Sequence, residues 1–271
     1  DVKEKNLEDG VYKGYINGLN DPYSVYYNKK ETKELYESTG GEYSGIGAVM
    51  SQNTETGVIT LVQIYKDSPA EKAGLKENDI LYKVEGKEVT GKDLSKVVSK
   101  VKGEKGTTVE LTVLRGEDAK EVTVTATRDT VQAQTIEYKM MDDKIGYIRV
   151  SEFDTVTYDQ YKEALDDLEK QGMTGLVVDL RNNPGGSLST VCDMLDLMLP
   201  KGLIVYTEDK NGKKTEMKSD EEHQFTKPLA VLVNGNSASA SEIYSGAIQD
   251  YGIGKIVGTQ TYGKGVVQQI F

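Results

Sequence analysis

Strand-like and helix-like stretches alternate through the second half of the sequence, between about residues 131 and 271. Apolar runs of strand length alternate with segments whose apolar residues have helical spacing. The strand-like runs are 145–150, 176–180, 203–206, 229–233 and 256–258, and the helical patterns are 158–170, 188–199 and 239–250. This alternation predicts an α/β domain, in which helices pack against a sheet.

The first half has a different pattern, of short β-type runs with two helical insertions. The runs are 47–51, 58–64, 80–84, 108–114 and 121–127. In the first insertion Ser68 suits a helix cap, Pro69 the first helical position and Gly74 the end of the helix. The apolar residues of 94–101 keep the i, i+3, i+4, i+7 spacing of one helix face. These features predict a small, partly open β-barrel over residues 43–129.

The sequence therefore divides into a helical segment at 1–42, a β module at 43–129 and an α/β core at 130–271. The first segment mixes charged and aromatic residues with short helical patterns. We interpret it as a docking or dimerisation element, which would make the protein a homodimer. A packing arm without a function of its own is the alternative.

Composition excludes several classes of function. The formal net charge of -11 argues against binding nucleic acid or anionic lipid, because both need a basic surface. The single Cys192 lies in an apolar helical pattern and is predicted to be a core thiol. The single His223 lies in a polar run that is typical of a solvated loop. A serine/histidine triad would have to use this residue, and a zinc site would lack the usual second histidine or cysteine cluster. No run approaches the roughly 18 apolar residues of a membrane span, and the sequence shows no signal peptide.

Residues 43–129 resemble a PDZ domain. The resemblance rests on the YSGIG run at 43–47, the DSPAEKAGL run at 67–75 and the NDIL run at 78–81. It implies that Gly45, Ile46 and Gly47 form a carboxylate-binding loop, because glycines allow successive backbone amides to converge on one anion. An extended peptide tail would then pair with an open strand edge. A simple turn made by the glycines is the alternative.

Three serines follow the strand-like run 229–233 and precede a helix. These are Ser237, Ser239 and Ser241. A serine at a strand-to-helix turn is exposed, and the amide after it can stabilise an oxyanion at the helix N-terminus. Spacing alone does not choose among the three, and a helix cap without catalysis is the alternative.

Two glycine-containing turns could complete such a site. The run 179–187 leaves a strand and enters a helix, and its paired Gly185 and Gly186 expose backbone amides. In the run 261–268, Lys264 stands between glycines in an uncharged neighbourhood. Desolvation favours the neutral form of a lysine, which can serve as general base where no histidine is available. An ordinary glycine turn and an ordinary surface lysine are the alternatives.

Taken together, the β module, the NPGG turn, the SASASEI run and the YGKG run resemble the C-terminal processing peptidases, or tail-specific proteases, of serine peptidase family S41. The resemblance covers the chain from about Tyr23 and implies a ClpP/crotonase-like α/β peptidase core, with the PDZ domain inserted in it or preceding it. By this resemblance Ser239 is the nucleophile, Lys264 the general base and Gln268 its positioning partner. The oxyanion hole would consist of the amides of Gly185 or Gly186 and of Ala240.

The resemblance also predicts partners and location. Substrates would be proteins or peptides with free, apolar C-termini, and no metal or other cofactor would be needed. The family works outside the cytoplasm, so the protein would be secreted or held by a membrane anchor that is absent from this chain. The lysine- and glutamate-rich composition suggests a bacterial source. The family usually continues beyond the position of Phe271, so the activity of the chain as given is left open. A non-catalytic tail-binding adaptor and a crotonase-like acyl enzyme are the rival functions.

Overall fold

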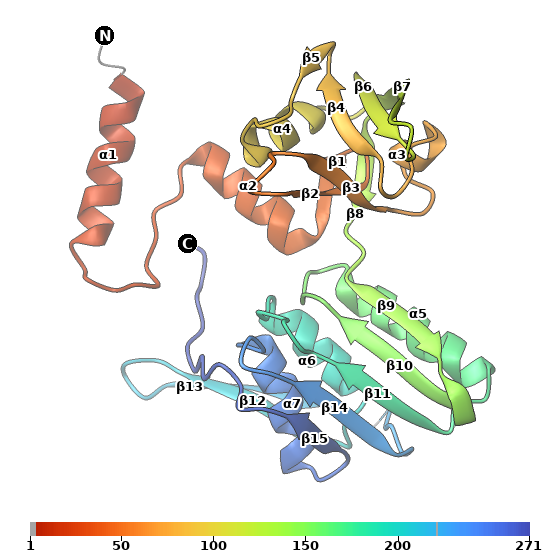
Figure 1. Ribbon diagram of the computed structural model, residues 1–271. Helices are drawn as coiled ribbons and strands as arrows, with labels where there is room; N and C mark the ends of the chain where they lie inside the picture. Colours follow the sequence, from red (N-terminus) through yellow and green to blue (C-terminus); the bar gives the residue numbers. More distant parts are fainter. Residues whose placement is uncertain (1–3, 221) are drawn as a thin grey trace. The chain divides into compact units, whose positions relative to one another are not determined.

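The chain folds into two compact units. The computed structural model describes residues 4–220 and 222–271. One unit, here called the α/β unit, combines the chain up to Gly41 with Thr135–Phe271, and the other, the β unit, is Glu42–Gln134 (Figure 1). The β unit is therefore inserted between two segments of the α/β unit.

An antiparallel sheet forms most of the β unit. Its strands, in spatial order, are β2 (Ala48–Gln52), β3 (Ile59–Ile64), β4 (Ile80–Val84), β6 (Thr108–Arg115) and β7 (Lys120–Thr127), and β5 (Lys87–Glu88) also pairs with β4. Two further strands pair with each other, β1 (Glu42–Gly45) and β8 (Asp129–Gln132). Because β8 pairs with β1, this unit ends at Gln134 and not at the expected residue 129.

Two helices complete the β unit, α3 (Pro69–Lys72) and α4 (Leu94–Val101). The predicted cap of α3 is present, because Ser68 Oγ accepts a hydrogen bond from Glu71 N at 3.2 Å. Apolar residues of the sheet and of α4 form one buried core. Helix α4 packs beside β2, the strand at the end of the sheet.

A five-stranded sheet is the centre of the α/β unit. In spatial order it contains β15 (Lys255–Gly258), β14 (Leu229–Val233), β11 (Gly175–Asp179), β10 (Ile145–Val150) and β9 (Ile136–Met140). The first four strands are parallel to one another, and β9 is antiparallel to β10. A short 3-10 helix, η1 (Asp142–Lys144), connects β9 and β10.

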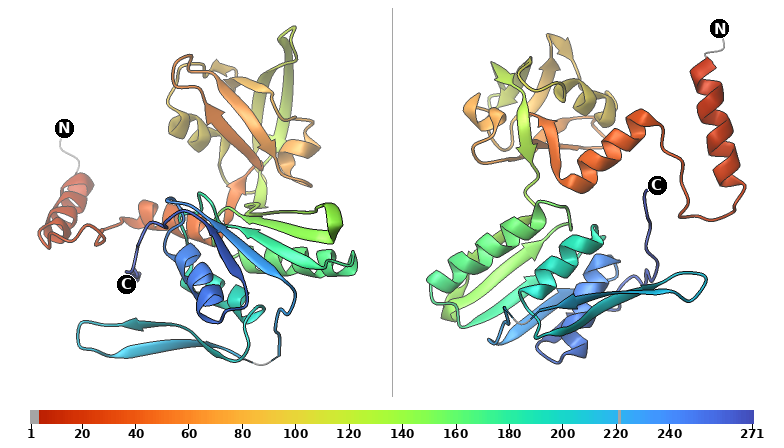
Figure 2. Two further views of the ribbon diagram at one scale, coloured as in Figure 1. Left: turned by 60° about the horizontal axis from the view of Figure 1, so that its bottom comes forward. Right: turned by 180° about the vertical axis from the view of Figure 1, so that it is seen from behind.

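Three helices cover one face of this sheet: α5 (Thr157–Lys170), α6 (Leu188–Asp196) and α7 (Ala240–Asp250) (Figures 1 and 2). Every second residue of β10 is buried against them, as alternation in a half-covered sheet requires. Between the helices Tyr161 and Tyr244 are fully buried, and their hydroxyls share a hydrogen bond of 2.7 Å. This core holds the carboxyl ends of the parallel strands in fixed positions.

The remaining parts of the α/β unit lie around this sheet. Strands β12 (Gly202–Glu208) and β13 (Lys214–Ser219) form an antiparallel hairpin that turns around Asn211. Helices α1 (Glu4–Asn17) and α2 (Lys29–Gly40) form the first segment. The end of α2 is bound to the unit where Thr155 N donates to Thr39 O at 3.2 Å. Among the described residues, no helix has both the length and the apolar character that a membrane crossing requires.

Candidate active site

The strand-to-helix junction after β14 has an unusual backbone at Ser239. This residue precedes the first turn of α7 and has φ 55° and ψ −113°. A positive φ is rare for a residue with a side chain and costs of order 1–3 kcal/mol, so the surrounding structure must impose it. Such strain is typical of a nucleophile held at a sharp strand-to-helix turn.

The other two serines of the junction bind the backbone. Ser237 is buried, and its Oγ donates to Leu180 O at 2.7 Å. Ser241 is buried as well, and its Oγ donates to Asn183 O at 3.0 Å. Ser239, in contrast, is only half-buried. The structure thus separates three serines that spacing alone could not separate.

The turn at Gly185 and Gly186 lies against Ser239. A Cβ on Gly185 would be 2.8 Å from the Cβ of Ser239 and 3.0 Å from Ala240 N, and one on Gly186 would overlap the carbonyl of Phe153. Both glycines have positive φ, 106° and 142°. Only glycine permits this close approach in this conformation.

Two backbone amides at this turn are available to a substrate. Gly185 N donates to Asn183 Oδ1 at 2.8 Å, so its hydrogen is already used. Within the described part of the chain, no hydrogen bond is donated by the N–H of Gly186 or of Ala240. The structure therefore favours Gly186 over Gly185 as the oxyanion donor that would act with Ala240.

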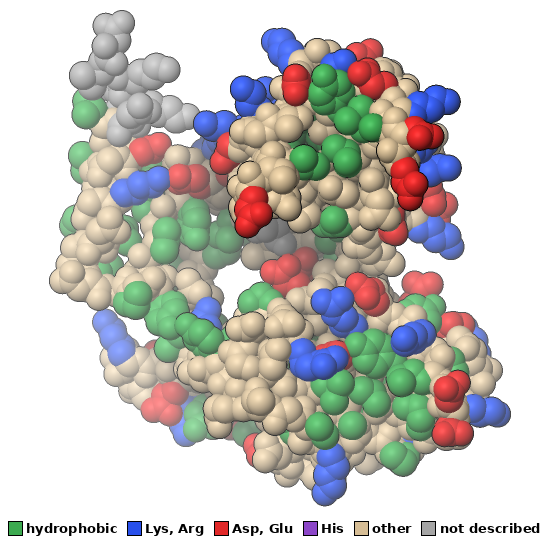
Figure 3. All heavy atoms as spheres, in the orientation of Figure 1, with side chains coloured by type: hydrophobic (Ala, Val, Ile, Leu, Met, Phe, Trp, Pro, Cys, Tyr) green, Lys and Arg blue, Asp and Glu red, His purple; other side chains and the backbone are tan. Residues whose placement is uncertain are grey.

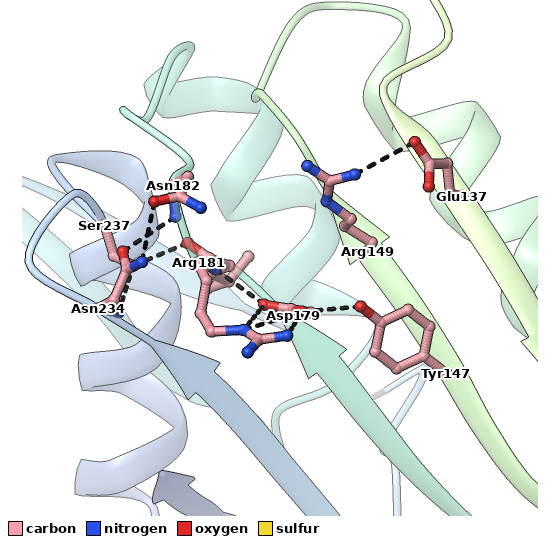
Figure 4. A network of polar contacts seen from close by, with 9 residues as sticks. Glu137, Tyr147, Arg149, Asp179, Arg181, Asn182, Asn234 and Ser237 are labelled. Atoms are coloured by element: carbon pink, nitrogen blue, oxygen red, sulfur yellow. Dashed lines mark hydrogen bonds and ion pairs between the residues drawn. The ribbon is translucent and has the colours of Figure 1, made fainter. Parts of the chain in front are cut away.

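Two asparagine side chains fasten the glycine turn to the serine junction. Asn182 N donates to Asn234 Oδ1 at 3.0 Å, and Asn234 Nδ2 donates back to Asn182 Oδ1 at 2.9 Å. Figure 4 shows this pair beside Ser237. These two hydrogen bonds fix the loop that follows the carboxyl end of β11 relative to the loop that follows the carboxyl end of β14.

Lys264 and Gln268 lie together in the irregular chain after β15. Lys264 Nζ donates to Gln268 Oε1 at 3.2 Å, and Gln268 Nε2 donates to Tyr23 O at 3.0 Å. Lys264 Nζ also lies 5.4 Å from the centre of the Tyr23 ring. Residues 259–271 have no regular secondary structure. A four-residue spacing would separate two side chains by about 13 Å along a strand, so the irregular backbone is what allows this contact.

Glu242 joins the serine junction to the lysine segment, a role that its position in the sequence did not reveal. Its Oε2 accepts hydrogen bonds from Ser239 N at 2.8 Å and Lys264 N at 2.9 Å, and its Oε1 accepts one from Gly263 N at 2.6 Å. Burial alone would raise the pKa of Glu242, but these backbone donors and the Thr261 side chain outweigh it and lower the pKa. The carboxylate is therefore ionised and well suited to hold both segments. The S-x-x-E spacing of a capping box was the available signal.

A second polar network lies on the sheet face opposite the helices. Asp179 accepts hydrogen bonds from Arg181 Nη2 at 2.6 Å and Tyr147 Oη at 2.7 Å (Figure 4). Burial favours the protonated form of Asp179, yet these donors outweigh it and lower its pKa. The network borders a cavity of about 790 Å³ that also reaches Arg149 and Asn182. Figure 3 shows hydrophobic and basic side chains gathered over β9, β10 and β11.

The loop predicted to bind a carboxylate lies in the β unit between β1 and β2. Ile46 O accepts from Ala70 N at 2.7 Å and Gly47 O from Tyr65 N at 2.9 Å, so the loop carbonyls are fixed. In the chain as described, the N–H groups of Ile46 and Gly47 donate no hydrogen bond. Gly47 has φ 76°, and Gly45 ends β1. Strand β2 has one edge that no described strand pairs.

The two residues set aside in the sequence analysis are not in this site. Cys192 is buried in the helix layer, and burial, followed by the charge of Asp193, raises its pKa to about 11. His223 is exposed. Over the described ranges, no group of three or more His, Cys, Asp or Glu side chains is arranged to hold a metal ion.

Comparison with known proteins identifies both units. Residues 144–271 match peptidase family S41, and residues 60–115 match a PDZ domain. The segment 144–271 belongs to peptidase family S41, and a PDZ domain precedes it. The resemblance predicted from the sequence is therefore confirmed. We now call the β unit the PDZ unit.

Curated relatives named carboxy-terminal processing proteases match nearly all of this chain. It is 39% identical to the carboxy-terminal processing protease CtpA of Bacillus subtilis over 266 residues, which are 98% of this chain and 56% of that protein. It is 37% identical over 272 residues to CtpB of the same organism, covering 99% and 56%. The chain thus spans about half the length of the curated relatives it matches.

A solved structure supports the fold. The photosystem II D1 C-terminal processing protease is 26% identical, with a TM-score of 0.55 over 99% of this chain and 74% of that chain. The predicted S41 peptidase fold with a PDZ domain is confirmed by this match.

Proposed function

We propose that this chain carries the catalytic and tail-reading parts of a serine endopeptidase that acts on protein C-termini. The observation that supports it best is the strained Ser239, which lies against Gly185 and is followed by Ala240; the N–H groups of Gly186 and Ala240 are unused. Glu242 ties the same residue to the segment of Lys264. The backbone of the proposed base segment is thus tied to the proposed nucleophile, whose neighbourhood has two unused amides, and this arrangement supports acyl transfer.

In the proposed mechanism Lys264 Nζ accepts the proton of Ser239 Oγ as the oxygen attacks the scissile carbonyl carbon. The negative charge moves to the carbonyl oxygen, which accepts hydrogen bonds from Gly186 N and Ala240 N. The intermediate collapses by breaking the C–N bond, and the leaving amine takes the proton from Lys264. Water then attacks the acyl-enzyme with the same base, which releases the acid and regenerates Ser239. Gln268 orients the lysine amine throughout.

The PDZ unit would hold the substrate's C-terminal tail. The N–H groups of Ile46 and Gly47 are available for the terminal carboxylate, and the free edge of β2 is available for the tail backbone. Partly buried apolar residues flank this edge, Ala48 and Met50 from β2 and Leu94 from α4. Their presence supports a preference for apolar tails.

The rival functions explain less of the molecule. A non-catalytic adaptor would not need a strained serine next to two unused amides. A crotonase-like acyl enzyme would explain the α/β unit, but it would give the PDZ unit no function. The homodimer, the bacterial source and the location outside the cytoplasm stay predictions.

The test combines covalent labelling with peptide cleavage. A fluorophosphonate probe should label the unmodified chain at Ser239, and Ser239→Ala should lose both labelling and cleavage of an unstructured peptide with an apolar C-terminus. Lys264→Ala should lower cleavage at least 100-fold. Lys255→Ala, which changes an exposed lysine of β15, should leave it unchanged. Peptide binding without labelling in the unmodified chain would support the adaptor and contradict the proposal.

A further inference from the structure

We propose that Tyr23 is a positioning residue of the catalytic base: its carbonyl orients the amide of Gln268, and its ring holds the amine of Lys264. This inference rests on the proposed function, because it assumes that Lys264 takes the proton of Ser239. It gives the first segment of the chain a role in the reaction, whereas the sequence analysis expected a docking or dimerisation element or a packing arm.

A tight turn between α1 and α2 presents Tyr23. Pro22 and Tyr23 are the turn residues, and proline suits such a position because its φ is fixed. The carboxylate of Asp21 accepts hydrogen bonds from Tyr23 N at 3.3 Å and from Ser24 Oγ at 2.5 Å. The Ser24 hydroxyl, and after it the Tyr23 N–H, lowers the pKa of Asp21. The ionised carboxylate therefore holds the turn in one conformation.

This turn lies against the segment that carries the proposed base. Gln268 Nε2 donates to Tyr23 O at 3.0 Å, which joins two positions 245 residues apart in the sequence. The C-terminal segment lies beside the connection between α1 and α2 (Figures 1 and 2). Both segments belong to the α/β unit, so the contact lies within one compact unit.

The carbonyl of Tyr23 selects one orientation of the Gln268 amide. A glutamine side chain has one oxygen that accepts and one NH2 group that donates, whereas a carbonyl only accepts. Tyr23 O therefore binds the NH2 group, and Oε1 faces Lys264 Nζ at 3.2 Å. The opposite orientation would direct the NH2 group at the amine and occupy the lone pair that must take the serine proton.

The ring of Tyr23 contacts the same amine. Lys264 Nζ lies 5.4 Å from the ring centre, within the range of a cation–π contact. A neutral amine can direct one of its two N–H groups at such a ring. The other N–H then points at Gln268 Oε1, and the lone pair is left for the proton of Ser239 Oγ.

The amine needs such partners because the backbone contacts of Lys264 do not fix its side chain. Glu242 Oε2 accepts from Lys264 N, but the four-carbon stem beyond the backbone is flexible. In the part of the chain that the structure describes, no ion pair includes Lys264. A carboxylate at the amine would favour the charged form, which cannot accept a proton. An amide and a ring face carry no net charge, so they hold the amine without that effect.

The same segment provides a matched control. Tyr27 is 42% exposed and Tyr23 is 41% exposed, so replacing either ring removes a similar surface. No described hydrogen bond or ring contact joins Tyr27 to Lys264 or Gln268. A comparison of Tyr23→Leu with Tyr27→Leu therefore separates an effect on the base from a general effect on the segment.

The experiment measures the rate of fluorophosphonate labelling at Ser239, the kcat and KM for an unstructured peptide with an apolar C-terminus, and Tm. Tyr23→Leu should lower labelling and kcat about 5-fold, with KM within about 2-fold and a change in Tm below about 2 °C. Tyr23→Phe should restore the parent values, and Tyr27→Leu should keep them. Asp21→Ala should lower kcat about 3-fold, because it loosens the turn that presents the carbonyl.

A double variant tests whether Tyr23 acts through the base. If Tyr23 and Gln268 hold one amine, Tyr23→Leu combined with Gln268→Ala should lower kcat by less than the product of the two single effects. Independent effects that multiply would refute the shared role.

The remaining outcomes decide different points. A parent chain that is neither labelled nor able to cleave the peptide would refute the proposed function, and with it this inference. Parent rates of labelling and cleavage in Tyr23→Leu would refute the inference alone. An equal loss in Tyr27→Leu, or a loss matched by a large fall in Tm, would also refute it, because Tyr23 would then act only through packing.

Discussion

Replacement of Glu242 by glutamine should disable the active site without unfolding the α/β unit. The carboxylate accepts three backbone N–H groups, from Ser239, Gly263 and Lys264. A glutamine side chain has one acceptor oxygen and one NH2 group. If its oxygen keeps the Ser239 and Lys264 donors, then its NH2 group faces the N–H of Gly263. At least one backbone donor therefore loses its acceptor.

The magnitude follows from these contacts. An unsatisfied donor in a partly buried site costs about 1–3 kcal/mol, and two charge-assisted bonds that become neutral lose about 1 kcal/mol in total. The sum, about 3 kcal/mol, is a factor of about 100 in the population of the assembled site. The cost falls on the irregular chain after β15, because the core of buried side chains does not depend on these bonds.

Cleavage kinetics and thermal unfolding together test this prediction. For Glu242→Gln we expect kcat/KM for an unstructured peptide to fall about 100-fold, with a change in Tm below about 2 °C. Glu169→Gln, which removes an exposed carboxylate paired with Lys227, should change neither. Because the pKa of Glu242 is lowered, its contribution is fully present at neutral pH and is lost only under acidic conditions. Unchanged kcat/KM in Glu242→Gln, or a fall matched by a large loss of Tm, would refute the reasoning.

Three further substitutions test the burial and backbone arguments. Burial, followed by the charge of Glu152, raises the pKa of Asp154 to about 7, so the free energy of unfolding should fall as pH rises from about 4 to 7. In urea unfolding, Asp154→Asn should therefore gain about 2 kcal/mol at pH 8 and nothing at pH 4. Equal gains at both pH values would contradict this. Gly185→Ala should abolish labelling of Ser239, because its Cβ would lie 2.8 Å from that residue's Cβ; labelling at the normal rate would contradict the close approach. Gly246→Ala, in α7 with open space around its Cβ, should raise stability by about 0.5–1 kcal/mol in the same urea assay, and a loss would show a contact that the structure lacks.

Hydrophobic periodicity was sufficient to predict most of the fold. Runs such as 145–150 and 229–233 appear as β10 and β14 with the same bounds, because a buried strand needs an unbroken or alternating apolar pattern. The strands that escaped prediction include β1, β5, β8 and β9, and most residues of β5, β8 and β9 are exposed. Their pairing depends on partners distant in sequence, which a local pattern does not contain.

The sequence predicted individual residues of the candidate site but not the hydrogen bonds that join its segments. Glycines at 185 and 186 and the lysine at 264 stood out because their surroundings were unusual for a surface turn. Glu242 did not, since an acid three residues after a helix cap is common and usually completes only that cap. Here the same carboxylate also reaches Gly263 and Lys264, which are more than twenty residues away. Only the folded structure shows that Glu242 also accepts these two hydrogen bonds.

The three serines of the junction show why spacing could not identify the nucleophile. Ser237 and Ser241 bind carbonyls of the segment between β11 and α6, Leu180 O and Asn183 O. Those bonds hold the glycine turn against the junction, and they leave the serine between them with a positive φ and its side chain half-buried. The repeated serines are therefore not interchangeable. The outer two hold the turn of Gly185 and Gly186 against the junction, and they leave Ser239 as the serine that lies against Gly185 with no carbonyl partner for its hydroxyl.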